Sequence, residues 1–117
     1  MLKPAEMARL AVQAMEDKKA QDITLMRTTD VTVLADYFVI CTAASTTQVK
    51  SISDAVEYVL TEAGEPPLRR EGERSSGWVL IDFGCVIVHV FMEEAREFYD
   101  LERLWADAEK IDIATLN

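Results

Sequence analysis

Two β-rich runs joined by a very short connection constrain the fold of this chain more than any other feature. Trp78–Asp82 and Cys85–Phe91 are rich in β-branched and aromatic residues, and only Phe83 and Gly84 separate them. Such a pair predicts a β-hairpin, which we expect at the centre of the sheet. Its register stays open, because Phe83 is unfavourable at a positive-φ turn position and a three-residue turn with Gly84 left-handed competes with a two-residue turn.

Helical and strand patterns alternate along the rest of the chain. Pro4 and a three-then-four apolar spacing predict a first helix that ends at about Lys18. Ser45 and Gln48 have the form of a capping box, which predicts the start of a second helix, and Gly64 ends it. The remaining predicted elements are strands at 22–27 and 36–42, an irregular connection at 28–35, a short strand with a polar loop at 68–77, and a last helix at 93–108.

The order of these elements predicts an α/β fold with a mixed sheet and flanking helices. A chain of 117 residues is too short for two domains of ordinary size. We therefore expect a single domain over residues 1–117, with its core at about residues 5–109. Because three helices are few for a sheet with two apolar faces, we expect an uncovered apolar area that binds a partner or a second copy of the chain, giving a homodimer when free.

The chain is acidic, with a formal net charge of −9. This charge argues against sequence-independent binding to nucleic-acid phosphates, which depends on clustered Lys and Arg, and we expect no direct DNA binding. An acidic surface favours a basic protein partner, although solubility alone explains it equally well. No apolar run reaches the length of a membrane span, and no secretory-type apolar segment follows the N-terminus. We expect a cytoplasmic protein that makes no contact with a membrane.

The cysteines and the histidine do not form a ligand pattern. Cys41 and Cys85 each lie in an apolar run, where a reduced thiol packs as a small hydrophobe, and the chain has no Cys-x-x-Cys. His89 is the only histidine. Its place mid-strand among valines favours a hydrogen-bonded sheet residue over a catalytic acid or base. We expect neither a metal site nor a cofactor.

Several sequence blocks, through their order and spacing, carry a resemblance to a known family over about Met7 to Ala108. The shorter blocks are Ser45 with Gln48-Val49, Glu71-Gly72 and Val88-His89-Val90-Phe91. The longer blocks are Asp36-Tyr37-Phe38-Val39-Ile40-Cys41-Thr42, Gly77-Trp78-Val79-Leu80-Ile81-Asp82-Phe83-Gly84, and Arg96 with Phe98-Tyr99-Asp100-Leu101-Glu102-Arg103-Leu104-Trp105. On these blocks the chain resembles the ribosomal silencing factor S family, also called Iojap-like or YbeB-like. Ala43 and Cys85 depart from the family pattern, which has Gly and commonly Asp at those places.

The resemblance implies a binding protein rather than an enzyme. Members of the family bind ribosomal protein fourteen of the large subunit, at the face where the small subunit docks. The implied function is therefore a steric block of subunit joining that represses translation. A dimeric scaffold without a ribosomal role is a further alternative.

A nucleotide-dependent transferase is the alternative enzymatic function. The family fold is similar to nucleotidyltransferases, which implies a nucleotidyltransferase-like topology here, and the loop 42–45 before a helix could bind a phosphate. Against this function, Asp82 has no Asp or Glu two positions away, although metal-dependent phosphoryl transfer needs grouped carboxylates. The loop also has no glycine.

The candidate partner-binding residues surround the hairpin and the start of the last helix. Trp78 has the character of an interface anchor, and packing at the edge of the core is its alternative role. The acidic residues Glu71, Asp82, Glu93 and Glu94 supply a rim for a basic partner or an ordinary solvated surface. The full predicted set is Glu71, Trp78, Leu80, Asp82, His89, Met92, Arg96 and Tyr99. If replacement of Trp78 by Ala leaves both fold and binding intact, we expect the contact around Met92, Arg96 and Tyr99.

Overall fold

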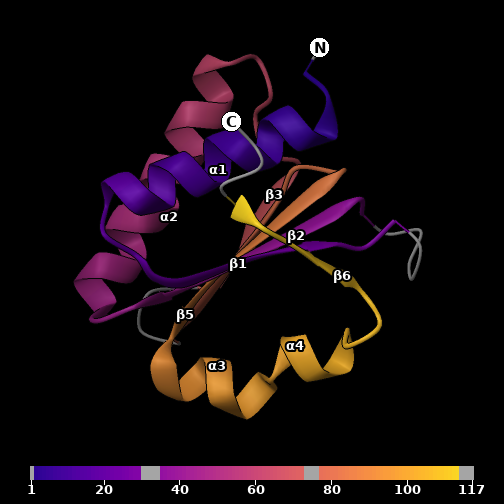
Figure 1. Cartoon of the computed structure of the whole chain (residues 1–117). Helices are drawn as coiled ribbons and strands as arrows, with labels where there is room; N and C mark the ends of the chain where they lie inside the picture. The colour runs from indigo at the N-terminus through magenta and orange to yellow at the C-terminus, as the bar shows by residue number, and fades with distance from the viewer. Residues whose placement is uncertain (1, 30–34, 73–76, 114–117) are drawn as a thin grey trace.

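A six-stranded mixed sheet with helices on both faces forms the part of the chain that the computed structural model describes, residues 2–29, 35–72 and 77–113 (Figure 1). The elements are α1 (Pro4–Asp17), β1 (Gln21–Arg27), β2 (Tyr37–Ala43), α2 (Thr46–Glu62), β3 (Arg69–Glu71), β4 (Trp78–Asp82), β5 (Val86–Met92), α3 (Glu93–Tyr99), α4 (Leu101–Leu104) and β6 (Glu109–Ile111). The predicted α/β class with a mixed sheet is confirmed, and the nucleotidyltransferase-like topology stays a prediction. Parts of the predicted segments 28–35 and 68–77 lie outside the described residues.

The strands lie in the order β3-β4-β5-β2-β1-β6. The β2–β5 pair is parallel and the other neighbouring strands are antiparallel. A parallel pair needs a crossover connection, and the chain between β2 and β5 includes α2. The predicted hairpin is confirmed as β4 and β5, but it is not the centre of the sheet. The centre is the β5–β2 pair, which has two strands on either side, and β2 has side chains in the apolar cores of both faces.

The hairpin has a two-residue turn, one of the two alternatives that the sequence offered, but the turn lies one residue later than Phe83 and Gly84. Asp82 pairs with Ile87, and the N–H of Phe83 donates to the carbonyl of Val86 at 2.9 Å, so Gly84 and Cys85 form the connection. Gly84 has a φ of +91°, which a glycine adopts without the steric cost that a side chain brings. Placing the turn one residue later keeps Phe83 out of that conformation and leaves its ring buried.

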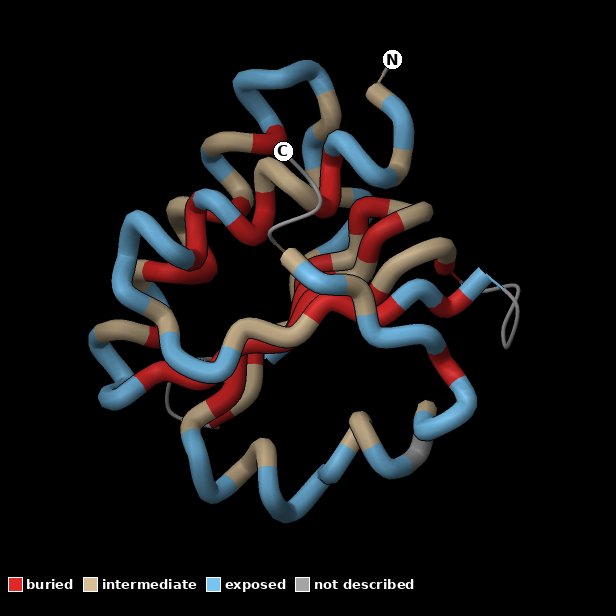
Figure 2. The backbone as a smooth tube through the Cα atoms, viewed as in Figure 1, coloured by how far each residue is buried: buried red, intermediate tan, exposed pale blue. Residues whose placement is uncertain are grey.

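The two faces of the sheet have separate apolar cores. Helices lie on both sides of the sheet (Figure 1), and the buried residues are concentrated in the sheet and in α1 and α2 (Figure 2). α1 and α2 cover one face, where Val79, Val88 and Val90 of the hairpin pack with the buried side of both helices. The other face carries a smaller core that includes Phe38 and Phe91 and lies on the side of α3 and α4. The alternation of side chains along each strand produces this division.

The ends of the helices follow local signals. α1 stops one residue before the predicted Lys18. The Ser45 hydroxyl accepts a hydrogen bond from the backbone N–H of Gln48 at 3.1 Å, and the Gln48 side chain accepts one from the backbone N–H of Ala44. This reciprocal capping starts α2 where it was predicted. No helix in the described part of the chain is long and apolar enough to cross a bilayer.

The C-terminal segment is not the single helix that was predicted for residues 93–108. Asp100 takes a left-handed conformation, with a φ of 44°, and separates α3 from α4. Asp is among the few residues that adopt this conformation without a large penalty. The chain then returns to the sheet, where β6 pairs with β1 as an edge strand. The apolar spacing in this segment therefore serves two short helices rather than one long one.

Candidate functional site

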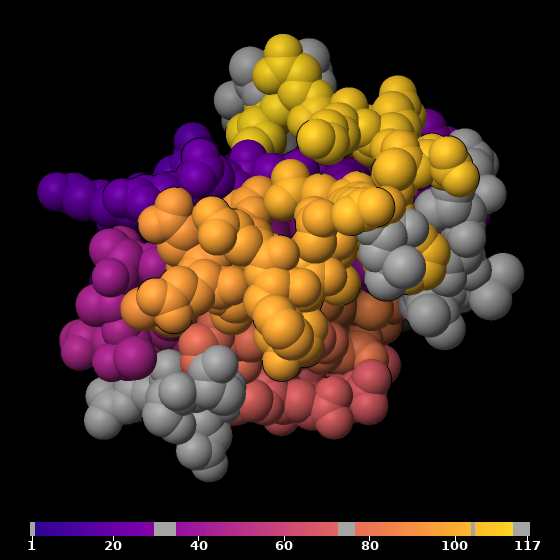
Figure 3. Space-filling view, turned by 90° about the horizontal axis from the view of Figure 1, so that it is seen from below, coloured from indigo at the N-terminus to yellow at the C-terminus, as the bar shows by residue number. Residues whose placement is uncertain are grey.

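The candidate site lies on the sheet face that carries α3 and α4. Strand alternation places Trp78, Leu80 and Asp82 of β4 on one face of the sheet. The hairpin register sets Phe91 opposite Trp78 and His89 opposite Leu80. In the view from the side of α3 and α4, α3 lies across the middle of the surface, with the β3 region beside it (Figure 3). The site is thus formed by β3, β4, β5 and α3.

Four aromatic rings meet on this face, and we call Trp78, His89, Phe91 and Tyr99 the Trp78 cluster. The Trp78 ring centroid lies 4.4 Å from that of Tyr99, 5.2 Å from that of Phe91 and 5.9 Å from that of His89. Phe91 is fully buried, whereas Tyr99 is 46% exposed. Trp78 is intermediate and packs against the smaller core. It therefore packs at the edge of the core while part of it reaches the surface, and its role as an interface anchor stays a prediction.

A small cavity opens beside the Trp78 cluster. It has a volume of about 190 Å³ and is lined by Glu71, Gly72, Trp78, Leu80 and Tyr99. Gly72 has a φ of +90°, and a Cβ at this position would lie 2.2 Å from the backbone oxygen of Trp78. Only glycine allows the two backbones to approach so closely. The loop after β3 is thereby held against β4, with Glu71 at the edge of the cavity.

His89 is a buried member of the cluster and is 4% exposed. Its Nδ1 accepts a hydrogen bond from the Trp78 indole at 3.2 Å, so the sequence-based expectation of a hydrogen-bonded sheet residue is confirmed. Its Nε2 has no hydrogen-bond partner among the described residues. Burial lowers the pKa of His89 from 6.5 to about 4, so the ring is neutral at pH 7. In this structure His89 positions the Trp78 indole and lies too deep to form the contact surface itself.

The acidic residues of β3 and β4 share one arginine. Asp82 accepts a hydrogen bond from the Gly84 N–H at 2.8 Å and pairs with Arg69 at 3.3 Å, so part of its role is to cap the hairpin turn. Arg69 also lies 3.7 Å from Glu71. These charged groups are largely exposed apart from Asp82. They form a polar border on the β3 side of the site.

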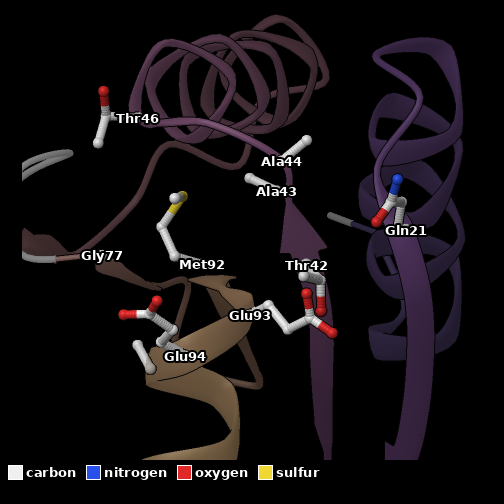
Figure 4. A pocket seen from close by; sticks show the side chains of 10 residues that line it. Gln21, Thr42, Ala43, Ala44, Thr46, Gly77, Met92, Glu93 and Glu94 are labelled. Carbon is white, nitrogen blue, oxygen red and sulfur yellow. The ribbon is translucent and has the colours of Figure 1, made fainter.

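Met92, Glu93 and Glu94 belong to a different hollow. They line a cavity of about 490 Å³ together with residues of β1, β2, the start of α2 and the loop before β4. In the close view Met92 lies between Gly77 and Ala43, and Glu93 lies beside Thr42 (Figure 4). Met92 packs against the larger core, on the opposite face from Trp78. The four acidic residues that the sequence predicted as one rim therefore lie in two places. Glu71 and Asp82 are on the side of the Trp78 cluster, and Glu93 and Glu94 line this second cavity.

Arg96 fastens α3 to the sheet. Its guanidinium donates to the backbone oxygen of Asp22 at 2.5 Å and to the hydroxyls of Thr24 and Thr42 at 2.9 Å each. It also pairs with Glu102 of α4 at 2.9 Å, and its side chain is 13% exposed. Its role as a partner contact stays a prediction, but these bonds show a structural role that the sequence did not reveal. Its partners lie up to 74 residues away in the chain.

The loop 42–45, which could bind a phosphate under the alternative enzymatic function, forms the N-terminal cap of α2. The backbone N–H groups of Ala44 and Gln48 already donate to side chains within the loop and helix. Among residues 2–29, 35–72 and 77–113, no three His, Cys, Asp or Glu side chains gather where they could hold a metal ion. Cys41 and Cys85 are free thiols, and burial raises the pKa of both.

Comparison with known proteins identifies the family. A family model described as "Ribosomal silencing factor during starvation" matches residues 2–117. The chain belongs to the ribosomal silencing factor family. A relative named ribosomal silencing factor RsfS from Halalkalibacterium halodurans is 40% identical over 108 residues, which are 92% of each chain. The crystal structure of a Chromobacterium violaceum protein aligns with a TM-score of 0.87 at 38% identity, covering 90% of this chain and 88% of that one.

The chain is also similar to a mouse protein. The mouse protein named mitochondrial assembly of ribosomal large subunit protein 1 is 29% identical over 102 residues, which are 82% of this chain and 43% of the mouse protein. The resemblance to ribosomal silencing factors predicted from the sequence blocks is confirmed, as is the fold.

Proposed function

We propose that this chain binds the large ribosomal subunit through ribosomal protein fourteen and sterically blocks joining of the small subunit, which represses translation. Membership of the ribosomal silencing factor family supports a ribosomal role. The name of the mouse relative, which refers to assembly of the ribosomal large subunit, supports the choice of subunit. We propose that this action takes place in the cytoplasm.

The Trp78 cluster supports the choice of contact surface. The rings of Trp78 and Tyr99 are partly exposed next to a small cavity, and they pack against the buried ring of Phe91. Interface anchors are commonly Trp, Tyr or Arg side chains held rigidly at the centre of a contact. The chain's net charge of −9 would attract a basic ribosomal protein and speed the encounter.

The proposed mechanism needs no chemical step. The described part of the chain measures 32 × 31 × 26 Å. Subunits that join through surface contacts must approach to within the width of a few atoms, because direct hydrogen bonds and packing contacts form only at such distances. A body of this size on the docking face therefore excludes the second subunit as long as it stays bound.

Sedimentation of ribosomes tests the function. Purified small and large subunits are mixed at moderate magnesium with and without the protein, and the joined and free fractions are measured. We expect the protein to increase the free subunits and to co-sediment with the large one. Tyr58→Ala is the control variant, because Tyr58 is 66% exposed on α2, on the opposite face of the sheet. An unchanged ratio of joined to free subunits would contradict the proposed block of subunit joining.

We also infer that the free protein forms a homodimer through its exposed aromatic residues on α3. Phe98 is 81% exposed and contacts the ring of Tyr99 at a centroid distance of 5.1 Å. Such a pair beside the Trp78 cluster leaves apolar area that a second copy can bury. A dimer through this surface would compete with ribosome binding.

A further inference from the structure

The cavity beside Trp78 has the composition of a binding site for a planar cation. We propose that it receives one arginine side chain of the partner, with the guanidinium against the rings of Trp78 and Tyr99 and its charge paired with Glu71. That the arginine belongs to a ribosomal protein rests on the function proposed above. That the cavity binds a guanidinium group rests on its own geometry.

The lining of the cavity matches the two halves of an arginine side chain. Trp78 and Tyr99 supply aromatic surface, with centroids 4.4 Å apart and ring planes inclined by 44°, and Leu80 adds an aliphatic side chain. Glu71 is the one carboxylate among the described residues of the lining. A guanidinium stacks on aromatic rings while its edge donates to a carboxylate, and its aliphatic stem packs against apolar side chains. An ammonium group fits this arrangement less well, because it is compact and strongly hydrated.

The chain's own Arg69 indicates that Glu71 has room for a second cation. Arg69 lies 3.7 Å from Glu71 but closer, at 3.3 Å, to Asp82. Asp82 is thus the closer partner of Arg69, and among the described residues Glu71 has only this long, exposed ion pair. A carboxylate accepts several hydrogen bonds, so acceptor capacity remains at the edge of the cavity. Arg69 should therefore compete weakly with an incoming arginine.

Gly72 keeps the carboxylate and the rings at a defined spacing. Its φ of +90° and the 2.2 Å that would separate its Cβ from the Trp78 oxygen show that the loop backbone lies directly against β4. Glu71 is also paired with Leu80 in the β3–β4 ladder. The charged edge and the aromatic wall are therefore set before any ligand arrives, which lowers the entropic cost of binding.

The first experiment uses arginine itself and needs no ribosome. The ¹⁵N-labelled protein is titrated up to tens of millimolar with N-acetyl-arginine methylamide, with the lysine analogue, and with the citrulline analogue, which has the same shape without the charge. We expect saturable shifts of the Trp78 indole N–H and the Gly72 amide in the order arginine, lysine, citrulline. Arginine shifts no larger than those of citrulline overturn the proposal.

Two variants that should change arginine affinity in opposite directions give a second test in the same titration. Glu71→Gln should weaken arginine binding by roughly threefold to tenfold, because an ion pair and its orientation are lost. Arg69→Gln should strengthen binding by about twofold to threefold, because it removes the competing cation. Glu62→Gln, a matched charge change on the exposed surface of α2, should have no effect. Equal effects of Glu71→Gln and Glu62→Gln contradict the proposal.

Binding to isolated large subunits separates this proposal from the proposed function. If the protein binds the arginine analogue but not the large subunit, the cavity assignment stands and the proposed ribosomal function fails. If the subunits bind and neither Glu71→Gln nor Arg69→Gln changes their affinity, the cavity is not the contact and this inference fails alone. When both hold, replacing each arginine of ribosomal protein fourteen with Gln should identify one whose loss is not additive with Glu71→Gln.

Discussion

The indole N–H of Trp78 donates a hydrogen bond to Nδ1 of His89 at 3.2 Å, across the β4–β5 hairpin. The two residues are diagonal neighbours, because His89 pairs with Leu80 and Trp78 with Phe91. The bond requires that Nδ1 is unprotonated, so the ring proton of neutral His89 is on Nε2. The partly exposed Trp78 ring that we place at the interface is thus oriented by a buried, neutral histidine.

This relationship predicts an acid-sensitive contribution to stability. The pKa of His89 is about 4 in the folded chain against an ordinary value of 6.5. Protonation therefore favours the unfolded chain, so the contribution is complete above about pH 6.5 and is lost as the pH falls toward 4. At about pH 4.5 we expect the loss from this residue to be about 2 to 3 kcal/mol.

His89→Gln isolates this effect from the titration of carboxylates. The Gln side chain has an oxygen that can accept from the Trp78 indole, but it does not titrate. Urea unfolding of the wild type and the variant between about pH 4.5 and 7 gives the difference. The wild type should lose more free energy of unfolding on acidification than the variant does. Parallel pH profiles for the two proteins count against the assignment.

Arg96 is predicted to hold α3 in place. Its hydrogen bonds to Asp22, Thr24 and Thr42 and its ion pair with Glu102 connect α3 to β1, β2 and α4. Arg96→Ala should lower the free energy of unfolding by about 2 kcal/mol or more, because several charge-assisted bonds are lost together. Hydrogen exchange of the α3 amides should accelerate more than that of α1. Glu102→Gln, which removes the ion pair alone, should have a smaller effect on both measurements.

Local patterns predicted the parts of the fold that depend on neighbouring residues. The hairpin follows from two β-rich runs around Gly84, and the start of α2 follows from Ser45 and Gln48. The break at Asp100 and the strand β6 were missed, because the apolar spacing of residues 98–108 also fits one helix. Whether that segment continues or returns to the sheet depends on β1, which is distant in sequence.

The candidate site could be predicted only where strand alternation decides it. Trp78 and Leu80 had to share a face once β4 was recognised. The approach of Tyr99 to Trp78 depends on how α3 packs, and the separation of Met92 from the Trp78 cluster depends on which face of β5 it occupies. Arg96 holds α3 against the sheet through hydrogen bonds to residues of β1 and β2, and no local sequence pattern indicates these partners.

Self-association through α3 predicts a concentration-dependent mass. Phe98 is 81% exposed, so its replacement by Ser should cost little stability while it removes apolar area from the proposed dimer. Light scattering at high micromolar concentration should show a dimer for the wild type and mostly monomer for Phe98→Ser. Tyr58→Ala should leave the dimer intact. A strictly monomeric wild type would contradict the proposed dimer and would leave the proposal of ribosome binding unaffected.

The role of Trp78 can be tested by measuring fold and binding together. Trp78 is only partly buried, while Phe91 beneath it is fully buried, so Trp78→Ala should leave the circular dichroism and the melting curve close to those of the wild type. Loss of an interface anchor commonly costs upward of about 2 kcal/mol, roughly thirtyfold in affinity. We therefore expect a large loss of binding to the large subunit with a retained fold.

Glu71→Ala provides the contrast with Trp78→Ala, because it removes one charge and leaves the aromatic rings in place. Beyond the roughly threefold to tenfold loss of affinity expected when the arginine loses its ion pair, it should slow association at low salt, and this difference in rate should shrink as salt screens the attraction. If Trp78→Ala unfolds the domain, Trp78 serves the core and its packing explains its place in the cluster. If that variant keeps both fold and binding, the contact lies elsewhere, and the hollow that Met92, Glu93 and Glu94 line becomes the surface to test.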